Sequence, residues 1–188
     1  RKIRQVLGLK NVYVVPGDSD NDKTAKEELG RKGALLLNDL LGSADIVAIS
    51  GGSTMAEVAR MLPESNANAV ILPARGSMGN HVEFQANYIA AGIAAKTHSS
   101  YRMIHLPENL SESALRIMYE SDTQAKENVA MTARAQVVLF GIGRADRMAK
   151  KRGMTSHQRQ TLQTLGARGE SLGCYCSLTA AFCMVLII

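Results

Sequence analysis

The chain has 188 residues, a length that suits one domain, and 46% of them are hydrophobic, which is enough to bury a sizeable core. Tryptophan is absent and aromatic residues make up only 4%, so this core should be aliphatic, and base-stacking platforms for a nucleic acid are few. The net charge of +5 is scattered along the chain and permits an acidic partner such as a phosphorylated metabolite.

The cysteines and the apolar segments favour a cytoplasmic protein. Cys174, Cys176 and Cys183 lie close together without the spacing of a zinc site, a redox site or a disulfide framework. The basic N-terminus is not followed by the apolar core of a signal peptide, and the apolar residues 178–188 are too few to span a membrane. We therefore expect a reducing, cytoplasmic location and no membrane contact.

Strands and helices alternate along the chain. Short apolar runs predict strands at 11–15, 46–49, 68–72, 101–106 and 136–140. Helices are expected at 6–8 (the end of one), 23–41, 53–62, 82–96, 111–119, 123–132 and 147–151. The apolar face of the helix 23–41 should hold Leu29, Gly33, Leu36, Leu37 and Leu40. This alternation predicts an α/β fold with a mostly parallel, doubly wound sheet.

Residues 45–62 contain the most informative pattern, a buried strand, a Gly-Gly turn and a helix that starts near Ser53. Glycines let a ligand approach the backbone, and the first N–H groups of a helix are unpaired and lie at the positive end of its dipole. Ser53 and Thr54 add hydroxyl donors. The turn therefore suits an anion, and the alternative is a tight connection with a Ser or Thr N-cap.

Two further strand ends carry loops that favour anions. Residues 73–79 place Arg75 between small residues, and Arg can hold a phosphate or carboxylate through two parallel hydrogen bonds. Residues 141–145 form a second Gly-rich turn, followed by the basic cluster 150–152. Because parallel strands bring all three loops to one edge of the sheet, the pattern predicts a site for a phosphorylated small molecule.

The sequence does not assemble a catalytic group. Gly141 and Gly143 lack the third Gly of a dinucleotide fingerprint, and the turn at 51–54 lacks a Walker lysine. No nucleophile and base stand at a recognisable spacing. The candidates are His81 and Glu83, which could face a ligand, His105, which should be structural within a strand, His157, which should be exposed in a polar helix, and Glu170.

An ordered set of motifs resembles the effector-binding domain of the SorC-type bacterial transcriptional regulators. The motifs are Gly-Leu-Lys-Asn-Val-Tyr-Val-Val-Pro-Gly-Asp (8–18), Gly-Gly-Ser-Thr (51–54), Pro-Ala-Arg-Gly (73–76), Gln-Ala-Asn (85–87), Gly-Ile-Gly (141–143) and Gly-Glu-Ser-Leu-Gly (169–173). The resemblance implies a Rossmann-like three-layer αβα fold of the NagB/RpiA/CoA-transferase type. It also implies a preceding helix-turn-helix domain, absent here, that binds operator DNA, and a homodimer or homotetramer.

The resemblance implies a phosphorylated sugar as effector, and fructose 1,6-bisphosphate in the branch that controls central glycolytic genes. A phosphate would lie against Gly52, Ser53 and Thr54, Gln85 and Glu170 would bind sugar hydroxyls, and Arg152 would meet a phosphate. The expected ligand residues are Gly51, Gly52, Ser53, Thr54, Arg75, Gly76, Gln85, Gly141, Gly143, Arg152 and Glu170. No cofactor, metal or catalytic residue is expected.

The family continues beyond this chain with a second Gly-Gly-Ser-Ser-Lys turn, so residues 1–188 are expected to form one effector domain that is incomplete at its C-terminus. The alternative function is a sugar-phosphate isomerase or deaminase on the same fold, because Gly-Gly-Ser-Thr also resembles ribose-5-phosphate isomerases. Such an enzyme needs a carboxylate base where this chain has Pro-Ala-Arg-Gly. A binding module is therefore expected rather than an enzyme.

Overall fold

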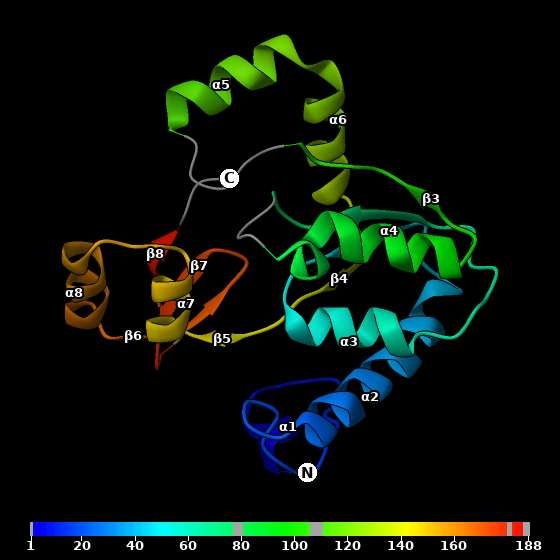
Figure 1. Ribbon diagram of the computed structural model, residues 1–188, viewed down its shortest axis with the longest axis horizontal. Coiled ribbons are helices and arrows are strands. Elements are labelled where there is room, and N and C mark those ends of the chain that lie inside the picture. Colours follow the sequence, from blue (N-terminus) through cyan, green and yellow to red (C-terminus); the bar gives the residue numbers. More distant parts are fainter. Residues whose placement is uncertain (1, 77–80, 106–110, 180–181, 186–188) are drawn as a thin grey trace.

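The computed structural model describes residues 2–76, 81–105, 111–179 and 182–185, and these residues form two sheets (Figure 1). A four-stranded parallel sheet has the order β3-β2-β1-β4, and a four-stranded antiparallel sheet has the order β5-β6-β7-β8. The expected α/β fold with a parallel sheet is confirmed. The antiparallel sheet was not expected. Residues 77–79 of the second strand-end loop and Leu106 of an expected strand lie outside the described residues.

The parallel sheet contains four of the five strands that the sequence predicts. They are β1 (Ile46–Ile49), β2 (Val70–Pro73), β3 (Ser100–Tyr101) and β4 (Val137–Leu139). The bounds of β1 are as predicted, and those of the other three strands are shorter or shifted. Side chains of neighbouring residues in a strand point to opposite faces. Val47, Ile49 and Ile71 therefore point to one face, which packs against three helices, α2 (Lys23–Leu41), α3 (Ser53–Met61) and α4 (Ala86–Lys96). Helix α6 (Thr123–Thr132) also contacts β1 and β2.

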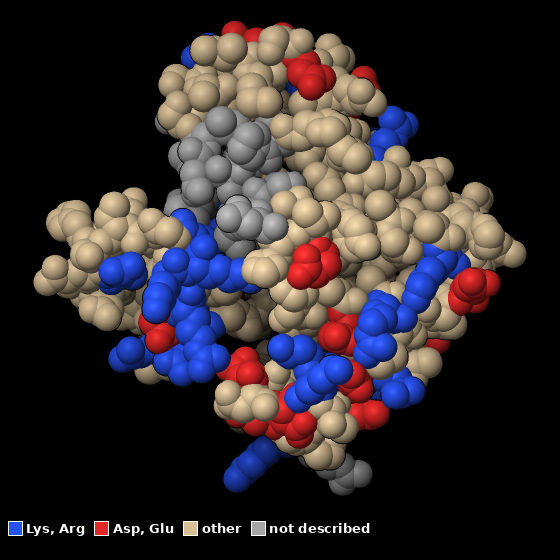
Figure 2. All heavy atoms as spheres, viewed as in Figure 1, with Lys and Arg blue, Asp and Glu red and all other residues tan. Residues whose placement is uncertain are grey.

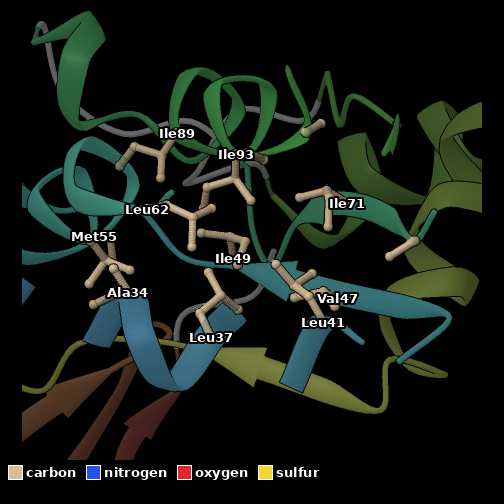
Figure 3. Close-up of a cluster of buried hydrophobic side chains, with 14 of the residues drawn as sticks. Ala34, Leu37, Leu41, Val47, Ile49, Met55, Leu62, Ile71, Ile89 and Ile93 are labelled. Carbon is tan, nitrogen blue, oxygen red and sulfur yellow. The ribbon is translucent and has the colours of Figure 1, made fainter. Parts of the chain in front are cut away.

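The core between the parallel sheet and these helices is aliphatic, as the composition predicts. Leu37 and Leu41 of α2 lie opposite Ile89 and Ile93 of α4, with Ile49 of β1 between them (Figure 3). Each of these side chains is at most 2% exposed, so each contributes its full apolar surface to folding. This packing fixes the sheet whose strand ends carry the candidate site.

Helix α2 has the predicted bounds, but the predicted apolar face is partly wrong. Its buried residues are Ala25, Gly30, Ala34, Leu37 and Leu41, whereas Leu40 is 48% exposed. The reason is a close approach to α3. A Cβ at Gly30 would lie 2.7 Å from the Cβ of Glu57, and one at Gly33 would lie 2.8 Å from Val58. Small residues, rather than leucines, therefore define the face at this crossing.

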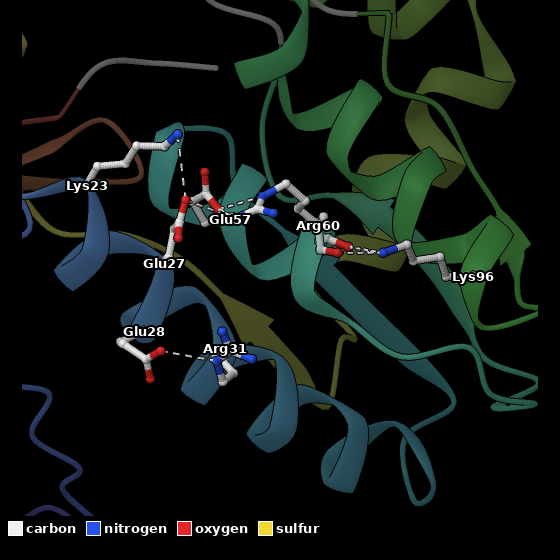
Figure 4. Close-up of polar contacts among 8 residues, drawn as sticks. Lys23, Glu27, Glu28, Arg31, Glu57, Arg60 and Lys96 are labelled. Atoms are coloured by element: carbon white, nitrogen blue, oxygen red, sulfur yellow. Dashed lines mark hydrogen bonds and ion pairs between the residues drawn. The ribbon is translucent and has the colours of Figure 1, made fainter.

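Polar contacts hold α3 in place from both neighbouring helices (Figure 4). At its C-terminal end, the ammonium group of Lys96 donates to the carbonyls of Ala59, Arg60 and Leu62 at 3.0, 2.8 and 3.1 Å. Along its side, Arg60 lies 3.5 Å from a carboxylate oxygen of Glu27 in α2. A cation at the carbonyl end of a helix also complements its dipole. These contacts hold the C-terminal half of α3 between α2 and α4.

The strand predicted at 11–15 is wrong. This segment follows the short helix α1 (Lys2–Val6), and no strand of the described residues pairs with it. Val14 is 78% exposed and Tyr13 is 49% exposed. The ammonium group of Lys32 lies 4.3 Å above the ring of Tyr13, so the segment lies against α2. Its β-type composition has no sheet edge to pair with, and pairing is what stabilises a strand.

Two other predicted elements differ from the structure. The helix expected at 82–96 is divided into a short 3-10 helix, η1 (Val82–Phe84), and α4, because Gln85 has an extended backbone (φ −75°, ψ 139°). The strand expected at 101–106 is only the two-residue β3, and His105 is exposed after it rather than structural within it. Helix α5 (Glu112–Ser121), capped by Ser111, matches the prediction closely.

The antiparallel sheet consists of β5 (Gly143–Arg144), β6 (Ala167–Ser171), β7 (Cys174–Ser177) and β8 (Phe182–Val185), with α7 (Ala145–Lys151) and α8 (Ser156–Thr164) beside it (Figure 1). The loop 141–143 is therefore not a simple turn into a helix, since it leads into β5 first. The apolar core beside the antiparallel sheet is small and includes Met154, Leu162 and the fully buried Tyr175. Among the described residues, no helix has the length and apolar character to cross a membrane.

Candidate functional site

A cavity of about 480 Å³ lies where the carboxyl ends of β1, β2 and β4 meet the antiparallel sheet. Its volume falls in the range of small-ligand sites. Every residue that the sequence analysis assigned to the ligand lines it. These residues are Gly51, Gly52, Ser53, Thr54, Arg75, Gly76, Gln85, Gly141, Gly143, Arg152 and Glu170. The structure therefore brings the three strand-end loops to one edge, as predicted, and adds walls from α7 and β6.

The turn between β1 and α3 depends on its two glycines. A Cβ at Gly51 would lie 2.6 Å from the carbonyl oxygen of Phe84, and Gly52 has a φ of 121°, which favours glycine. Gly52 is the N-cap of α3 and has no side chain to cap the helix. The alternative of a Ser or Thr N-cap is therefore wrong. Ser53 and Thr54 are the first helical residues, both half-buried at the cavity wall.

Arg75 connects the two sheets. It follows β2 and is 5% exposed, although it lines the cavity. Its guanidinium lies against the backbone of Gly173, so closely that a Cβ there would overlap it. Gly173 and Leu172 form the two-residue turn between β6 and β7, with φ values of 80° and 49°. Both values are positive, as in the tight hairpin turns that match strand twist.

Arg152 and Glu170 form a buried ion pair in the wall of the cavity. The guanidinium of Arg152 donates to Oε1 of Glu170 at 2.7 Å, and both side chains are at most 5% exposed. The same oxygen accepts the N–H of Gly173 at 2.7 Å. A ligand in the cavity would meet these two residues as a pair. Their separate roles toward phosphate and hydroxyl groups remain predictions.

The opposite wall comes from the residues around η1. Gln85 is half-buried between η1 and α4 and lines the cavity. His81 also lines it, and Nδ1 of His81 lies 3.2 Å from Oε1 of Glu83 in an exposed contact. The ammonium group of Lys151 in α7 lies 5.9 Å from the ring centroid of Phe84, across the cavity. His157 is exposed on α8, as predicted.

The rim of the cavity is basic. Lys151 belongs to the cluster 150–152 that the sequence indicated, whereas Arg144 and Arg147, which line the cavity beside it, were not expected. Figure 2 shows basic side chains gathered over β5 and α7. Arg147 and Lys151 are four residues apart on one face of α7, and this spacing could have revealed Arg147, whereas Arg144 is the extended N-cap residue of that helix. Arg144 donates to Asp146 through two hydrogen bonds of 3.1 and 2.8 Å, which lower the pKa of that exposed carboxyl group.

Asp20, from the acidic loop 18–22, also lines the cavity and was not expected there. Nothing in the local sequence signals it, because its partner Arg147 is 127 positions away. Both carboxylates at the cavity, Asp20 and Glu170, are thus paired with arginines. Among the described residues, no group of three His, Cys, Asp or Glu could hold a metal ion. The chemistry that this arrangement supports is anion binding by backbone N–H groups, hydroxyls and cations.

Comparison with known proteins gives a consistent result. A sequence model of the family described as "Putative sugar-binding domain" matches residues 1–177. The central glycolytic genes regulator of Priestia megaterium is 34% identical over 92% of this chain, and that of Bacillus subtilis is 33% identical over 93%. The crystal structure of a protein described as the "putative SorC family transcriptional regulator from Enterococcus faecalis" has a TM-score of 0.85 and 30% identity, covering 99% of this chain and 76% of that one.

The match covers 51% and 52% of the two glycolytic regulators, so this chain spans about half the length of the curated relatives it matches. The family match extends over nearly the whole chain and includes each strand-end loop that lines the cavity. The chain therefore belongs to the sugar-binding domain family of the SorC-type transcriptional regulators.

Proposed function

We propose that this chain is the effector-binding domain of a bacterial transcriptional repressor that senses fructose 1,6-bisphosphate and controls central glycolytic genes. The observation that carries the proposal is the cavity at the ends of β1, β2 and β4, which combines the glycine-capped N-terminus of α3 with a rim of arginines and a lysine. Helix N-termini and arginine side chains both favour phosphate. The names of the relatives support a role in glycolytic regulation.

In the proposed complex, one phosphate lies against Gly52 and accepts hydrogen bonds from the backbone N–H groups and hydroxyls of Ser53 and Thr54, because the N–H of Gly52 already donates to the carbonyl of Phe84. The second phosphate lies toward the basic rim on α7, on the other side of the cavity. Arg75 and Gln85 are between these ends and bind the sugar oxygens. A ligand with two phosphates then satisfies both walls, and a monophosphate satisfies one.

The output of this domain would be occupancy rather than chemistry. Operator DNA would be bound by a separate N-terminal domain of the whole cytoplasmic protein, which would act as a homodimer or homotetramer. An isomerase would need a free carboxylate base beside the sugar, and Asp20 and Glu170 are each paired with an arginine. Aldose–ketose turnover in a coupled assay would support the enzyme instead.

The test is calorimetric titration of the chain with fructose 1,6-bisphosphate, fructose 6-phosphate and dihydroxyacetone phosphate. We expect the bisphosphate to bind most tightly and to raise the melting temperature. Thr54→Val keeps the side-chain shape but removes the hydroxyl, so it should weaken binding about tenfold and leave the fold intact. Thr164→Val on α8 is the matched control, since Thr164 is exposed and is not among the residues that line the cavity.

The proposal would be rejected if none of the three sugar phosphates binds or shifts the melting temperature. Equal loss of affinity in Thr54→Val and Thr164→Val would instead remove the turn before α3 from the site. Preference for fructose 6-phosphate over the bisphosphate would contradict the assignment of a second phosphate to the α7 rim.

A further inference from the structure

An ion pair connects the N-terminal part of the chain to the rim of the cavity. The guanidinium of Arg147, in α7, donates to a carboxylate oxygen of Asp20 at 2.7 Å. Both residues line the cavity, although they come from segments 127 positions apart. Asp20 therefore places a negative charge beside the cations that would meet an anionic ligand. Its position calls for an explanation, because a carboxylate at this point opposes anion binding.

The loop that carries Asp20 has a defined internal structure. The carboxylate of Asp18 accepts the backbone N–H of Asp20 at 3.0 Å and the side-chain amide of Asn21 at 2.7 Å. Asp22 is the N-cap of α2 and accepts the N–H of Thr24 at 2.8 Å. Residues 18–22 are thus a compact turn that leads directly into α2. They contact α7 through the side chain of Asp20.

The ion pair between Asp20 and Arg147 is suited to replacement of its carboxylate by another anion. Arg147 and Asp20 are 55% and 56% exposed, and solvent screening makes such exposed pairs weak. A phosphate group carries up to two negative charges and can accept two parallel hydrogen bonds from one guanidinium. A phosphate that reaches Arg147 through the cavity therefore outcompetes a single exposed carboxylate. A second arginine of the rim, Arg144, is held by Asp146.

Resting on the proposed function, we propose that Arg147 is an anion-binding residue of this cavity and that Asp20 is its exchangeable internal partner. Binding of a phosphorylated sugar replaces the Asp20 carboxylate with a phosphate at Arg147. The exchange releases the loop 18–22 from α7 while α2 stays packed in the core. The segment before α2, which includes α1, then loses its tie to the cavity rim, so occupancy of the cavity is communicated to the N-terminal side of the chain.

Affinity gives the first test. Asp20→Asn removes the competing charge with little change in shape, so fructose 1,6-bisphosphate should bind about threefold to fivefold more tightly than to the original chain. Asp39→Asn is the matched control. Asp39 is exposed near the other end of α2, is not a lining residue of the cavity and gives the same change in net charge. The affinity of Asp39→Asn for fructose 1,6-bisphosphate should equal that of the original chain.

Hydrogen–deuterium exchange of residues 18–22 gives the second test. Adding fructose 1,6-bisphosphate should speed exchange in the original chain and in Asp39→Asn. In Asp20→Asn, exchange should already be fast and should not respond to the ligand. Arg147→Gln should also show fast exchange and should bind at least fivefold more weakly, whereas Arg31→Gln, which removes an arginine from an exposed ion pair on α2, should leave both readouts unchanged.

The outcomes separate this inference from the proposed function. If fructose 1,6-bisphosphate binds, but Asp20→Asn and Asp39→Asn have equal affinity and the exchange of 18–22 does not respond to the ligand, the exchange of partners at Arg147 is overturned and the effector site stands. If the bisphosphate binds none of the variants nor the original chain, the proposed function fails first. Normal affinity in Arg147→Gln would remove Arg147 from the site.

Discussion

The two sheets of this protein are stabilised in different ways. The parallel sheet is packed between helices by aliphatic side chains, many of them completely buried, such as Val47, Ile49 and Ile71. The antiparallel sheet has a small apolar core and, beside it, the buried pair Arg152 and Glu170. One region therefore depends on burial of apolar surface, and the other depends in addition on a charge that must stay compensated.

The difference extends to the cavity between them. The parallel sheet contributes backbone groups, through the turn at 51–54, which its rigid core holds in position. The antiparallel sheet and α7 contribute charged side chains, among them Arg147 and Lys151. A fixed wall of N–H groups opposite an adjustable wall of cations suits a ligand with an anion at each end. The following predictions test this division.

The largest effect is expected in the antiparallel sheet. Glu170→Gln removes the charge that compensates Arg152, which is 5% exposed, so the free energy of unfolding should fall by about 3 to 5 kcal/mol. Urea denaturation followed by circular dichroism would measure it. Replacing both partners, as Arg152→Met with Glu170→Leu, should recover part of the loss, because neither member of the pair then leaves the other as an unpaired charge, although the N–H of Gly173 also loses its acceptor. Equal losses in the single and double variants would contradict a dependence on the pair.

A slightly smaller effect is expected in the parallel sheet. Leu37→Ala removes a side chain that is 1% exposed and should lower the free energy of unfolding by about 3 kcal/mol. Leu40→Ala, on the same helix, removes a side chain that is 48% exposed and should cost about 0.5 kcal/mol. The same urea titration applies to both. Similar losses at the two positions would restore the apolar face predicted from the sequence.

The parallel sheet was largely predictable, because its strands are short apolar runs and its helices repeat at 3.6 residues. The run at 46–49 and the Gly-Gly turn after it located β1, the start of α3 and one wall of the cavity. The segment 11–15 has equally β-type residues, but in the part of the chain that the structure describes it meets no partner strand. Local composition does not report whether a sheet edge is nearby, so that prediction failed.

The antiparallel sheet was not predictable in the same way. The segment Ala167–Ser171 mixes small and charged residues, and its hairpin turn depends on a positive φ at Leu172, a residue type that rarely adopts one. Arg152 and Glu170 could be assigned to the site by resemblance, but their pairing could not, because it is a contact between distant segments. The contact between Asp20 and Arg147 could not be predicted for the same reason, because these residues are 127 positions apart.

A third, moderate effect is expected where the two regions meet. Gly173→Ala would force a left-handed conformation on alanine and would push its Cβ into the guanidinium of Arg75. Gly153→Ala imposes a similar positive φ, with no atom within 4 Å of the added Cβ. The free energy of unfolding should fall by about 1 kcal/mol in the control Gly153→Ala, from backbone strain alone, and by about 2 kcal/mol in Gly173→Ala. Only Gly173→Ala should also weaken fructose 1,6-bisphosphate binding, because it displaces Arg75.

Identical behaviour of the two glycine variants would show that Arg75 can move without consequence for the site. Loss of stability in both, with loss of affinity only in Gly173→Ala, would instead assign the hairpin turn a role in positioning Arg75. Calorimetric titration and urea denaturation on the same protein samples distinguish these results.

The smallest effect concerns the acidic loop beside the cavity. The N–H of Asp20, together with the amide of Asn21, donates to the Asp18 carboxylate and lowers its pKa. A depressed pKa in the folded state means that the ionised carboxylate stabilises the loop above the ordinary value of about 3.9 and that this stabilisation is lost as the pH falls through the lower, folded-state pKa. Exchange of the Asp20 amide, corrected for its intrinsic pH dependence, should therefore speed up on acidification below about pH 4.

Asp18→Asn separates this titration from other acid effects. An asparagine keeps one oxygen that can accept the N–H of Asp20, although its NH2 group replaces the oxygen that accepts from Asn21. Because it does not ionise, the corrected exchange of the Asp20 amide should become independent of pH in this range. Because Asp18 is fully exposed, global unfolding should respond very little to either change. If the variant keeps the pH dependence of the original chain, a different carboxylate controls the loop. The Asp20 pair with Arg147 would then be the first group to examine, since it is the contact by which the loop reaches the cavity.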